Sequence, residues 1–187
     1  MKKFLLLIFI LLNFVFGEYI DEKFDNTENI KPYKGYKCKE IKLEVIKDDF
    51  KEGKGSVKVI WKGMENGIGS GGIEKIIPES NLTGKTFTIW IKPVENVIPT
   101  FFFALYDKDG RVSMNAWHNI KIGDWNKIII KVGEKGDSNY FEKSKDDFKK
   151  INRIHFYFNS KEAEKEAIVI YDGFKEVKSI KDIIDIP

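Results

Sequence analysis

Two segments in the middle of the sequence carry aromatic and polar side chains that alternate with apolar ones. Thr100–Tyr106 and Arg111–Trp117 flank Asp107–Gly110, whose Asp-Gly end is typical of a hairpin turn. Because successive side chains of a strand point to opposite faces, each segment presents one apolar face and one mixed face. Aromatic rings cover the apolar faces of sugars and polar groups bind their hydroxyls, so the mixed face has the chemistry of a glycan site.

We expect this site to combine both segments with Ile151–Phe158, which also alternates. The predicted ligand-binding residues are Trp117, Tyr106, Arg111, Asn115, Tyr157 and His155. Trp117 and Tyr106 would stack on sugar faces, while Arg111 and Asn115 would bond ring-edge hydroxyls. The alternative is that these aromatic side chains fill one layer of the core and that the faces are reversed.

The carboxylates, serines and histidines of the sequence form no convincing catalytic pattern. Glycoside hydrolysis needs two carboxyl groups at a set separation, and Asp107 and Asp109 occupy a turn in which Asp is expected for structural reasons. The two histidines, His118 and His155, have no nucleophile elbow to serve, since Gly69–Gly71 lacks the required spacing. No zinc-binding pattern occurs. The sequence therefore predicts a protein without enzymatic activity.

Short apolar and aromatic runs are separated by turn-forming clusters, without a sustained 3.6-residue period. The expected strands are Ser56–Trp61, Phe87–Lys92, Thr100–Tyr106, Arg111–Trp117, Trp125–Val132, Ile151–Phe158 and Ala167–Phe174. Gly67–Gly72 is expected to be a loop, and Ser160–Glu166 a solvated connection. Strands at this spacing, with no helices between them, predict an all-β fold built as a two-sheet antiparallel β-sandwich.

The N-terminal segment has the features of an export signal. Lys2 and Lys3 precede an apolar run from Phe4 to Phe16, and the small residue Gly17 stands where cleavage would occur. An uncleaved membrane anchor is the alternative, but Asn13 breaks the run, which is shorter than the ~20 residues that span a bilayer. We therefore expect an exported bacterial protein that is periplasmic, on the cell surface or secreted. The expected organisation is a signal peptide at 1–17, a polar lead-in at 18–40 that packs on the domain, and a β-sandwich at 41–187.

Charge and cysteine content exclude several classes of protein. The 187 residues have a formal net charge of +3, of which Lys2 and Lys3 supply two units. The other lysines alternate with acidic residues, unlike the concentrated basic surface of a nucleic-acid-binding protein. Cys38 is the only cysteine, so no disulfide forms within the chain, and we expect it to be buried as a small apolar residue.

Six short segments match one family pattern when they are taken in order. They are Phe24-Asp25, Gly55–Trp61, Leu82–Lys92, Gly123–Ile128, Ile151–Ile154 and Ile168–Gly173. Together they resemble the carbohydrate-binding-module jelly rolls of the galactose-binding-like type. The resemblance covers nearly the whole chain after residue 17. It implies a non-catalytic module that binds a glycan of unknown class.

The same resemblance implies a structural calcium ion where an N-terminal acidic residue meets an aspartate of the last strand. By position the metal ligands would be Asp25 and Asp172, completed by backbone carbonyls toward the six to eight oxygens that calcium prefers. Asp25 departs from the family pattern, in which Glu usually follows the Phe. The alternative for Asp172-Gly173 is a turn that ends the strand.

Two segments also support a second, weaker resemblance. Gly123–Lys127 and Ile170–Lys175 are similar to parts of spirochaete-type flagellar filament outer-layer sheath proteins, which are typically much longer. This alternative implies a structural cell-envelope protein that self-associates through an apolar patch or a sheet edge. The first resemblance implies a glycan as partner. In either case we expect no nucleic acid and no stable membrane insertion after signal cleavage.

Overall fold

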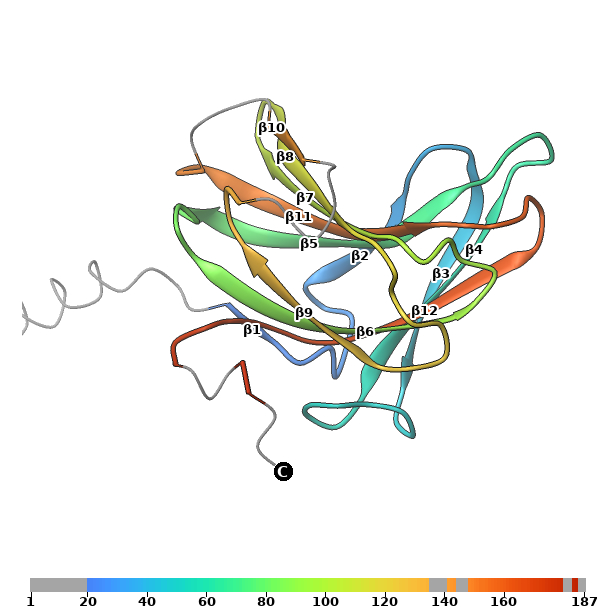
Figure 1. Ribbon diagram of the computed structural model, residues 1–187, viewed down its shortest axis with the longest axis horizontal. Helices are drawn as coiled ribbons and strands as arrows, with labels where there is room; N and C mark the ends of the chain where they lie inside the picture. The colour runs from blue at the N-terminus through green and yellow to red at the C-terminus, as the bar shows by residue number, and fades with distance from the viewer. Residues whose placement is uncertain (1–19, 135–140, 144–147, 180–182, 185–187) are drawn as a thin grey trace, which may run out of the picture.

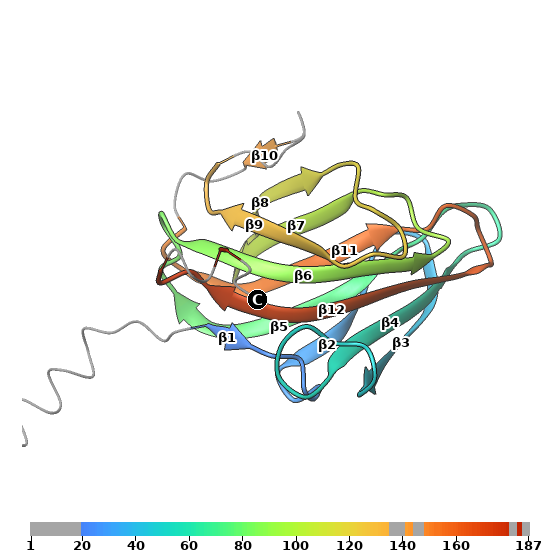
Figure 2. The same ribbon diagram turned by 60° about the horizontal axis from the view of Figure 1, so that its bottom comes forward.

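The computed structural model describes residues 20–134, 141–143, 148–179 and 183–184, and the regular elements of these residues are all β-strands. They form two layers that lie face to face (Figures 1 and 2). The all-β, two-sheet antiparallel sandwich predicted from the sequence is therefore confirmed. The predicted signal peptide at 1–17 lies outside the described residues.

The first sheet contains the first and the last strand, β1 and β12. Its order is β3 (Cys38–Ile46), β4 (Ser56–Gly63), β12 (Glu166–Glu176), β6 (Thr86–Glu95) and β9 (Asn126–Lys131), and the short β1 (Asp21–Glu22) also pairs with β12. The second sheet has the order β10 (Phe141–Lys143), β8 (Gly110–Trp117), β7 (Phe101–Asp107), β11 (Ile151–Asn159), β5 (Ser70–Ser80) and β2 (Ile30–Lys34). All of these pairs are antiparallel.

The core lies between the two sheets and is dominated by aromatic side chains. The largest fully buried residues include Trp61, Tyr171, Phe24, Phe87, Phe101, Phe156, Phe158 and Phe174. The Phe156 ring lies 4.8 Å from the Phe174 ring of the facing sheet in an edge-on contact. Such pairs stabilise a core by about 0.5–1.5 kcal/mol beyond the area that they bury. The chain therefore holds its two sheets together without a disulfide, and Cys38 is buried and reduced.

Each strand expected from alternation is present, because its apolar side chains face the core. In contrast, the expectation of a loop at Gly67–Gly72 was partly wrong, since Ser70 begins β5 and two of the glycines lie within that strand. A Cβ on Gly72 would stand 1.9 Å from the carbonyl oxygen of Phe156 on β11. Glycine occurs here because the backbones approach closely, which is its other role besides forming loops.

The N-terminal residues 20–46 contribute three strands to the two sheets. Ile20 and Phe24 are buried in the core, and Lys75 of β5 forms a largely buried ion pair with Glu22 of β1 (2.7 Å). No helix among the described residues is long and apolar enough to cross a membrane.

Candidate functional site

Three rows of side chains cross the outer face of the second sheet, because residues paired across antiparallel strands point to the same side. The first row consists of Tyr33, Gly72, Tyr157, Phe102 and Ala116. The second consists of Lys31, Glu74, His155, Ala104 and Met114, and the third of Ile76, Arg153, Tyr106 and Arg111. We call these three rows the aromatic face.

The rings of the aromatic face touch one another and form one platform. Phe102 stacks on Tyr157 with centroids 4.9 Å apart and planes 9° from parallel. Tyr33 lies 5.2 Å from Tyr157 and 4.3 Å from His155, which in turn lies 4.2 Å from Tyr106. Tyr33, Phe102, Tyr106 and Tyr157 are all partly exposed, so the platform offers ring surface to the solvent.

His155 lies at the centre of this platform, and its imidazole is neutral. Its Nε2 donates to a carboxylate oxygen of Glu74 (2.9 Å), while its Nδ1 is buried without a hydrogen-bond partner. Burial lowers the pKa of His155 below its usual range, although Glu74 acts in the opposite direction and Arg153 adds to the lowering. A proton on Nδ1 would find no acceptor, which agrees with this direction.

Two arginines flank Tyr106 along the third row. Arg153 lies with its Cζ 5.4 Å from the Tyr106 ring centroid, and its Nη2 donates to the carbonyl of Asp107 (3.1 Å). Arg111 pairs with Tyr106 across β7 and β8. Burial and nearby Tyr106 raise the pKa of the Tyr33 hydroxyl to about 12, and the positive charge of Arg111 opposes them. The Tyr33 hydroxyl therefore stays protonated and able to donate a hydrogen bond.

Four predicted site residues, Tyr106, Arg111, His155 and Tyr157, come together on the aromatic face. Trp117 does not join them: its ring packs 5.7 Å from Phe101 in the core, and the residue is 7% exposed.

Asn115 also points away from the aromatic face. It is 4% exposed, and its Nδ2 donates to the carbonyl of Glu134 (2.6 Å). The register of β7 and β8 shifts between Leu105 and Tyr106, which interrupts the alternation along β8. The expectation that Arg111, Asn115 and Trp117 share one face was therefore wrong, because an uninterrupted strand was assumed.

The predicted ligand-binding residues do not include four side chains that contact His155 or the rings of the aromatic face. Alternation already places Phe102 on the outward face with Tyr106, and the same period places Arg153 with His155. Tyr33 lies in the segment assigned to a polar lead-in, and Glu74 follows the expected glycine loop. For these last two residues the local sequence carries no signal, since only strand pairing brings them to the site.

The two aspartates expected to bind calcium accept hydrogen bonds from the backbone of one loop, which connects β3 and β4. Asp172 Oδ2 accepts the backbone N–H groups of Lys51 and of Glu52 (2.7 Å for Glu52), and Asp25 Oδ1 accepts that of Lys54. Asp172 Oδ1 is buried and has no hydrogen-bond partner. Burial raises the pKa of Asp172 to about 6 despite the amide hydrogen bonds. Within the described residues, no cluster of three or more His, Cys, Asp or Glu side chains could hold a metal.

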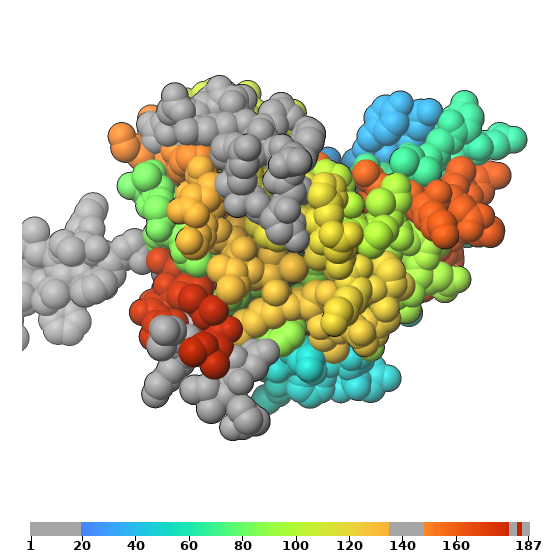
Figure 3. All heavy atoms as spheres, in the orientation of Figure 1, coloured from blue at the N-terminus to red at the C-terminus, as the bar shows by residue number. Residues whose placement is uncertain are grey.

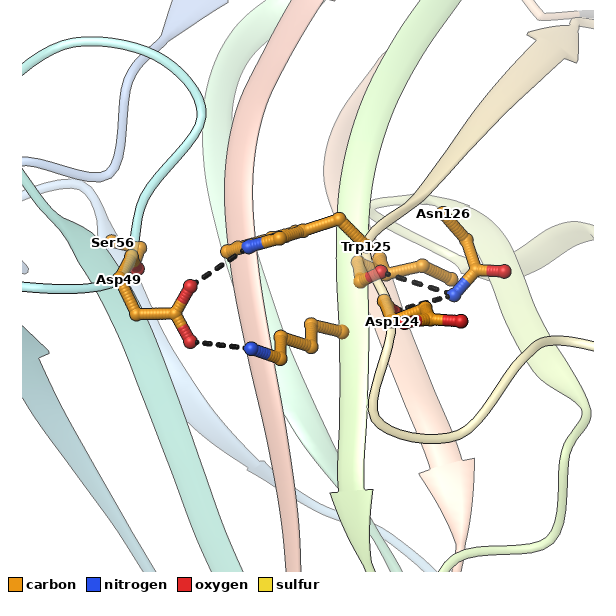
Figure 4. Close-up of polar contacts among 7 residues, drawn as sticks. Asp49, Ser56, Asp124, Trp125 and Asn126 are labelled. Carbon is orange, nitrogen blue, oxygen red and sulfur yellow. Dashed lines mark hydrogen bonds and ion pairs between the residues drawn. The ribbon is translucent and has the colours of Figure 1, made fainter.

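A separate polar network fastens the β3–β4 loop to the segment that leads into β9. Asp49 accepts hydrogen bonds from Trp125 Nε1 (2.8 Å) and Lys92 Nζ (2.8 Å), as Figure 4 shows. Asn126 Nδ2 donates to the carbonyl of Asp124 (2.8 Å). In the space-filling view the loop lies against this segment (Figure 3). The Gly-Asp-Trp-Asn motif thus has a structural explanation.

Comparison with known proteins identifies relatives by structure alone. No family model matches the chain, and no curated protein matches it. A family 11 carbohydrate-binding module from Clostridium thermocellum, solved with a β-1,3-1,4-mixed-linked tetrasaccharide, matches with a TM-score of 0.60 at 16% identity over 86% of this chain and 95% of that chain. The CBM22-1 xylan-binding domain of Paenibacillus barcinonensis Xyn10C matches with a TM-score of 0.53 at 15% identity, covering 86% of this chain and 94% of that one.

A third similar structure contains the CBM22-1 and GH10 modules of a Clostridium thermocellum endo-1,4-β-D-xylanase complexed with xylohexaose. The match has a TM-score of 0.53 and 11% identity, and it covers 84% of this chain but 28% of that chain. At these identities the likeness concerns the fold. The chain therefore has the jelly-roll β-sandwich of carbohydrate-binding modules, which confirms the fold that the sequence resemblance implies.

Proposed function

We propose that the protein is an exported, non-catalytic carbohydrate-binding module whose glycan lies on the aromatic face. The observation that carries this proposal is the continuous platform formed by Tyr33, His155, Tyr157, Phe102 and Tyr106 on one open sheet surface. Sugar rings stack on such platforms through their apolar faces. One of the similar structures is complexed with a β-1,3-1,4-mixed-linked tetrasaccharide and another is described as a xylan-binding domain, which supports a carbohydrate as the ligand of this chain.

Polar groups around the platform suit the hydroxyls of a glycan. Arg111 and Arg153 border Tyr106, and the Tyr33 hydroxyl is a donor at the opposite strand of the sheet. Tyr157 and Phe102 would stack on one sugar, while the polar groups would bind hydroxyls at its edges. Binding of this kind needs no acid–base pair, in keeping with a role without catalysis.

Binding to a glycan panel tests this proposal, with one variant on each sheet. Tyr157→Ala removes the ring that contacts both Tyr33 and Phe102, and we expect affinity to fall at least tenfold, about 1.4 kcal/mol. The matched control is Trp90→Ala, since Trp90 is a partly exposed ring on the outer face of the first sheet, between the ammonium groups of Lys51 and Lys127. Equal losses in both variants would contradict the assignment of the site.

A panel without any binding would favour the self-associating envelope protein, if the purified protein also forms large assemblies. The sheet edges argue for the glycan-binding function instead. The edge strand β3 carries Lys39, Glu40, Lys42 and Glu44, and the edge strand β2 contains Pro32. Charged residues and proline on edge strands oppose pairing with another sheet.

We also propose that a calcium ion binds Asp172 Oδ1, which is a buried oxygen. This oxygen fits a cation because it is a carboxylate oxygen that no donor satisfies. Asp25, which accepts a hydrogen bond from the same loop, would be the second carboxylate, and backbone carbonyls or water would supply the remaining oxygens. Thermal unfolding with calcium and with chelator tests this directly. A higher melting temperature with calcium in the wild type, but not in Asp172→Asn, is the expected result, and identical melting curves would contradict it.

Export rests on the N-terminal segment. Fractionation of the source cells, followed by mass spectrometry of the N-terminus, should recover the protein outside the cytoplasm and beginning at Glu18. An intact Met1 in the membrane fraction would support the anchored alternative.

A further inference from the structure

The arginines of this chain are concentrated in one place. Lys and Arg total 32, yet only Arg111 and Arg153 are arginines. Both lie in the third row of the aromatic face, on either side of Tyr106. The remaining cations are lysines spread over the molecule. Arginine and lysine carry the same charge. The occurrence of both arginines in this row, with lysines elsewhere, therefore points to a need for the guanidinium group itself.

The surrounding structure holds Arg153 against the platform. Its Nη2 donates to the Asp107 carbonyl (3.1 Å), and its guanidinium lies 5.4 Å from the Tyr106 ring centroid. Arg111 extends along the neighbouring strand, with its Nη1 3.8 Å from Met114 Sδ. A guanidinium oriented in this way loses less conformational entropy when it binds an anion than a free lysine does.

The charges of the three rows are predominantly positive. Lys31, Arg111 and Arg153 are cationic, whereas Glu74 is the acidic residue of these rows. Glu74 is also bound to His155 Nε2 (2.9 Å). The three rows themselves therefore contain more cationic side chains than carboxylates, and these side chains share the face with partly exposed aromatic rings.

We infer that the ligand of the aromatic face is an acidic glycan, whose carboxylate or sulfate groups are bound by Arg111 and Arg153. This inference rests on the proposed function and narrows it to one class of sugar. The planar guanidinium binds carboxylate and sulfate oxygens through two parallel hydrogen bonds, which are stronger than bonds between neutral groups. Neighbouring sugar rings would stack on Tyr157 and Phe102 of the first row.

The test compares acidic glycans with forms that lack either the carboxylate charge or the sulfate charge. The probes are polygalacturonate with its fully methyl-esterified form, and chondroitin sulfate with desulfated chondroitin. We expect at least tenfold tighter binding to the acidic member of one pair, and the pair that responds identifies carboxylate or sulfate. Equal affinity within both pairs would overturn this inference and leave the proposed function standing. Failure to bind any neutral or acidic glycan would remove the proposed function itself.

Variants separate bidentate binding from general attraction between charges. Arg111→Gln and Arg153→Gln should each weaken binding to the acidic probe about tenfold or more, and weaken binding to the esterified or desulfated form by a smaller factor. If the planar geometry of the guanidinium is required, Arg111→Lys should bind the acidic probe little better than Arg111→Gln. The matched control is Lys58→Gln, which removes one positive charge from the outer face of the first sheet. A loss of the same size in this control would overturn the inference, because non-specific attraction would then explain it.

Discussion

The outer faces of the two sheets have the same strand geometry but different side chains. The first sheet presents lysines with acidic partners: Glu44 contacts Lys42 and Lys58, Lys62 contacts Glu40 and Glu166, and Lys92 contacts Asp49. The second sheet presents connected aromatic rings and the two arginines. We call the first of these surfaces the lysine face.

The side chains of the lysine face are typical of a solvated surface, whereas those of the aromatic face are typical of a surface that binds a ligand. Exposed ion pairs such as Lys42–Glu44 contribute little to the free energy of unfolding, so the lysine face gains solubility more than stability. The aromatic face leaves ring area partly exposed, which has no benefit for folding. A bound sugar would cover that area. We therefore propose the second sheet as the binding surface, and the predictions below test this proposal.

The largest expected effect concerns Trp117, which would join the aromatic face if β8 alternated without interruption. Trp117→Ala removes a core ring packed on Phe101, so we expect a loss of about 3–5 kcal/mol in the free energy of unfolding. Urea denaturation measures it, with Trp90→Ala as the control on an outer face. A stable Trp117→Ala protein that no longer binds glycan would return Trp117 to the binding site.

Much of the fold, but only part of the site, could be predicted from the sequence. Alternation revealed the strands whose apolar sides face the core, because burial imposes a period of two. It failed along β8, where a register shift between Leu105 and Tyr106 turns Asn115 and Trp117 inward. It also could not reveal Tyr33, because its place beside His155 depends on the pairing of β2 with β5.

The next largest expected effect is a pH dependence of stability that is due to His155 on the aromatic face. The pKa of His155 is lowered in the folded protein, so the unfolded chain binds a proton first as the pH falls. The stability that neutral His155 contributes is therefore present above pH 6.5, and it is lost as the pH falls below that value. The groups facing His155 are Glu74, Arg153, Tyr33 and Tyr106.

Two measurements examine this pH effect. NMR titration of the imidazole should give a midpoint below 6.5, and His155→Gln should reduce the loss of stability between pH 6.5 and 5. A midpoint above 6.5 would mean that the pair with Glu74 is charged, and the account of the centre of the platform would be wrong.

The smallest effect is expected on the lysine face. Lys62 contacts Glu40 (3.3 Å) and Glu166 (3.7 Å), and its side chain is about one-third exposed. Because such exposed pairs are weak, Lys62→Gln should change the free energy of unfolding by less than about 0.5 kcal/mol and leave glycan binding unchanged. A loss of binding in this variant would show that the first sheet takes part in recognition.

The location of the bound glycan is the most direct test of the central claim. Amide and side-chain NMR shifts can be followed while the protein is titrated with tri-galacturonate as the acidic probe and xylohexaose as the neutral probe. The account predicts shifts concentrated at Tyr33, Phe102, Tyr106, Arg153 and Tyr157, with little change around Trp90 and Lys58. Shifts concentrated on the lysine face or in the β3–β4 loop would contradict the assignment of the aromatic face as the binding site.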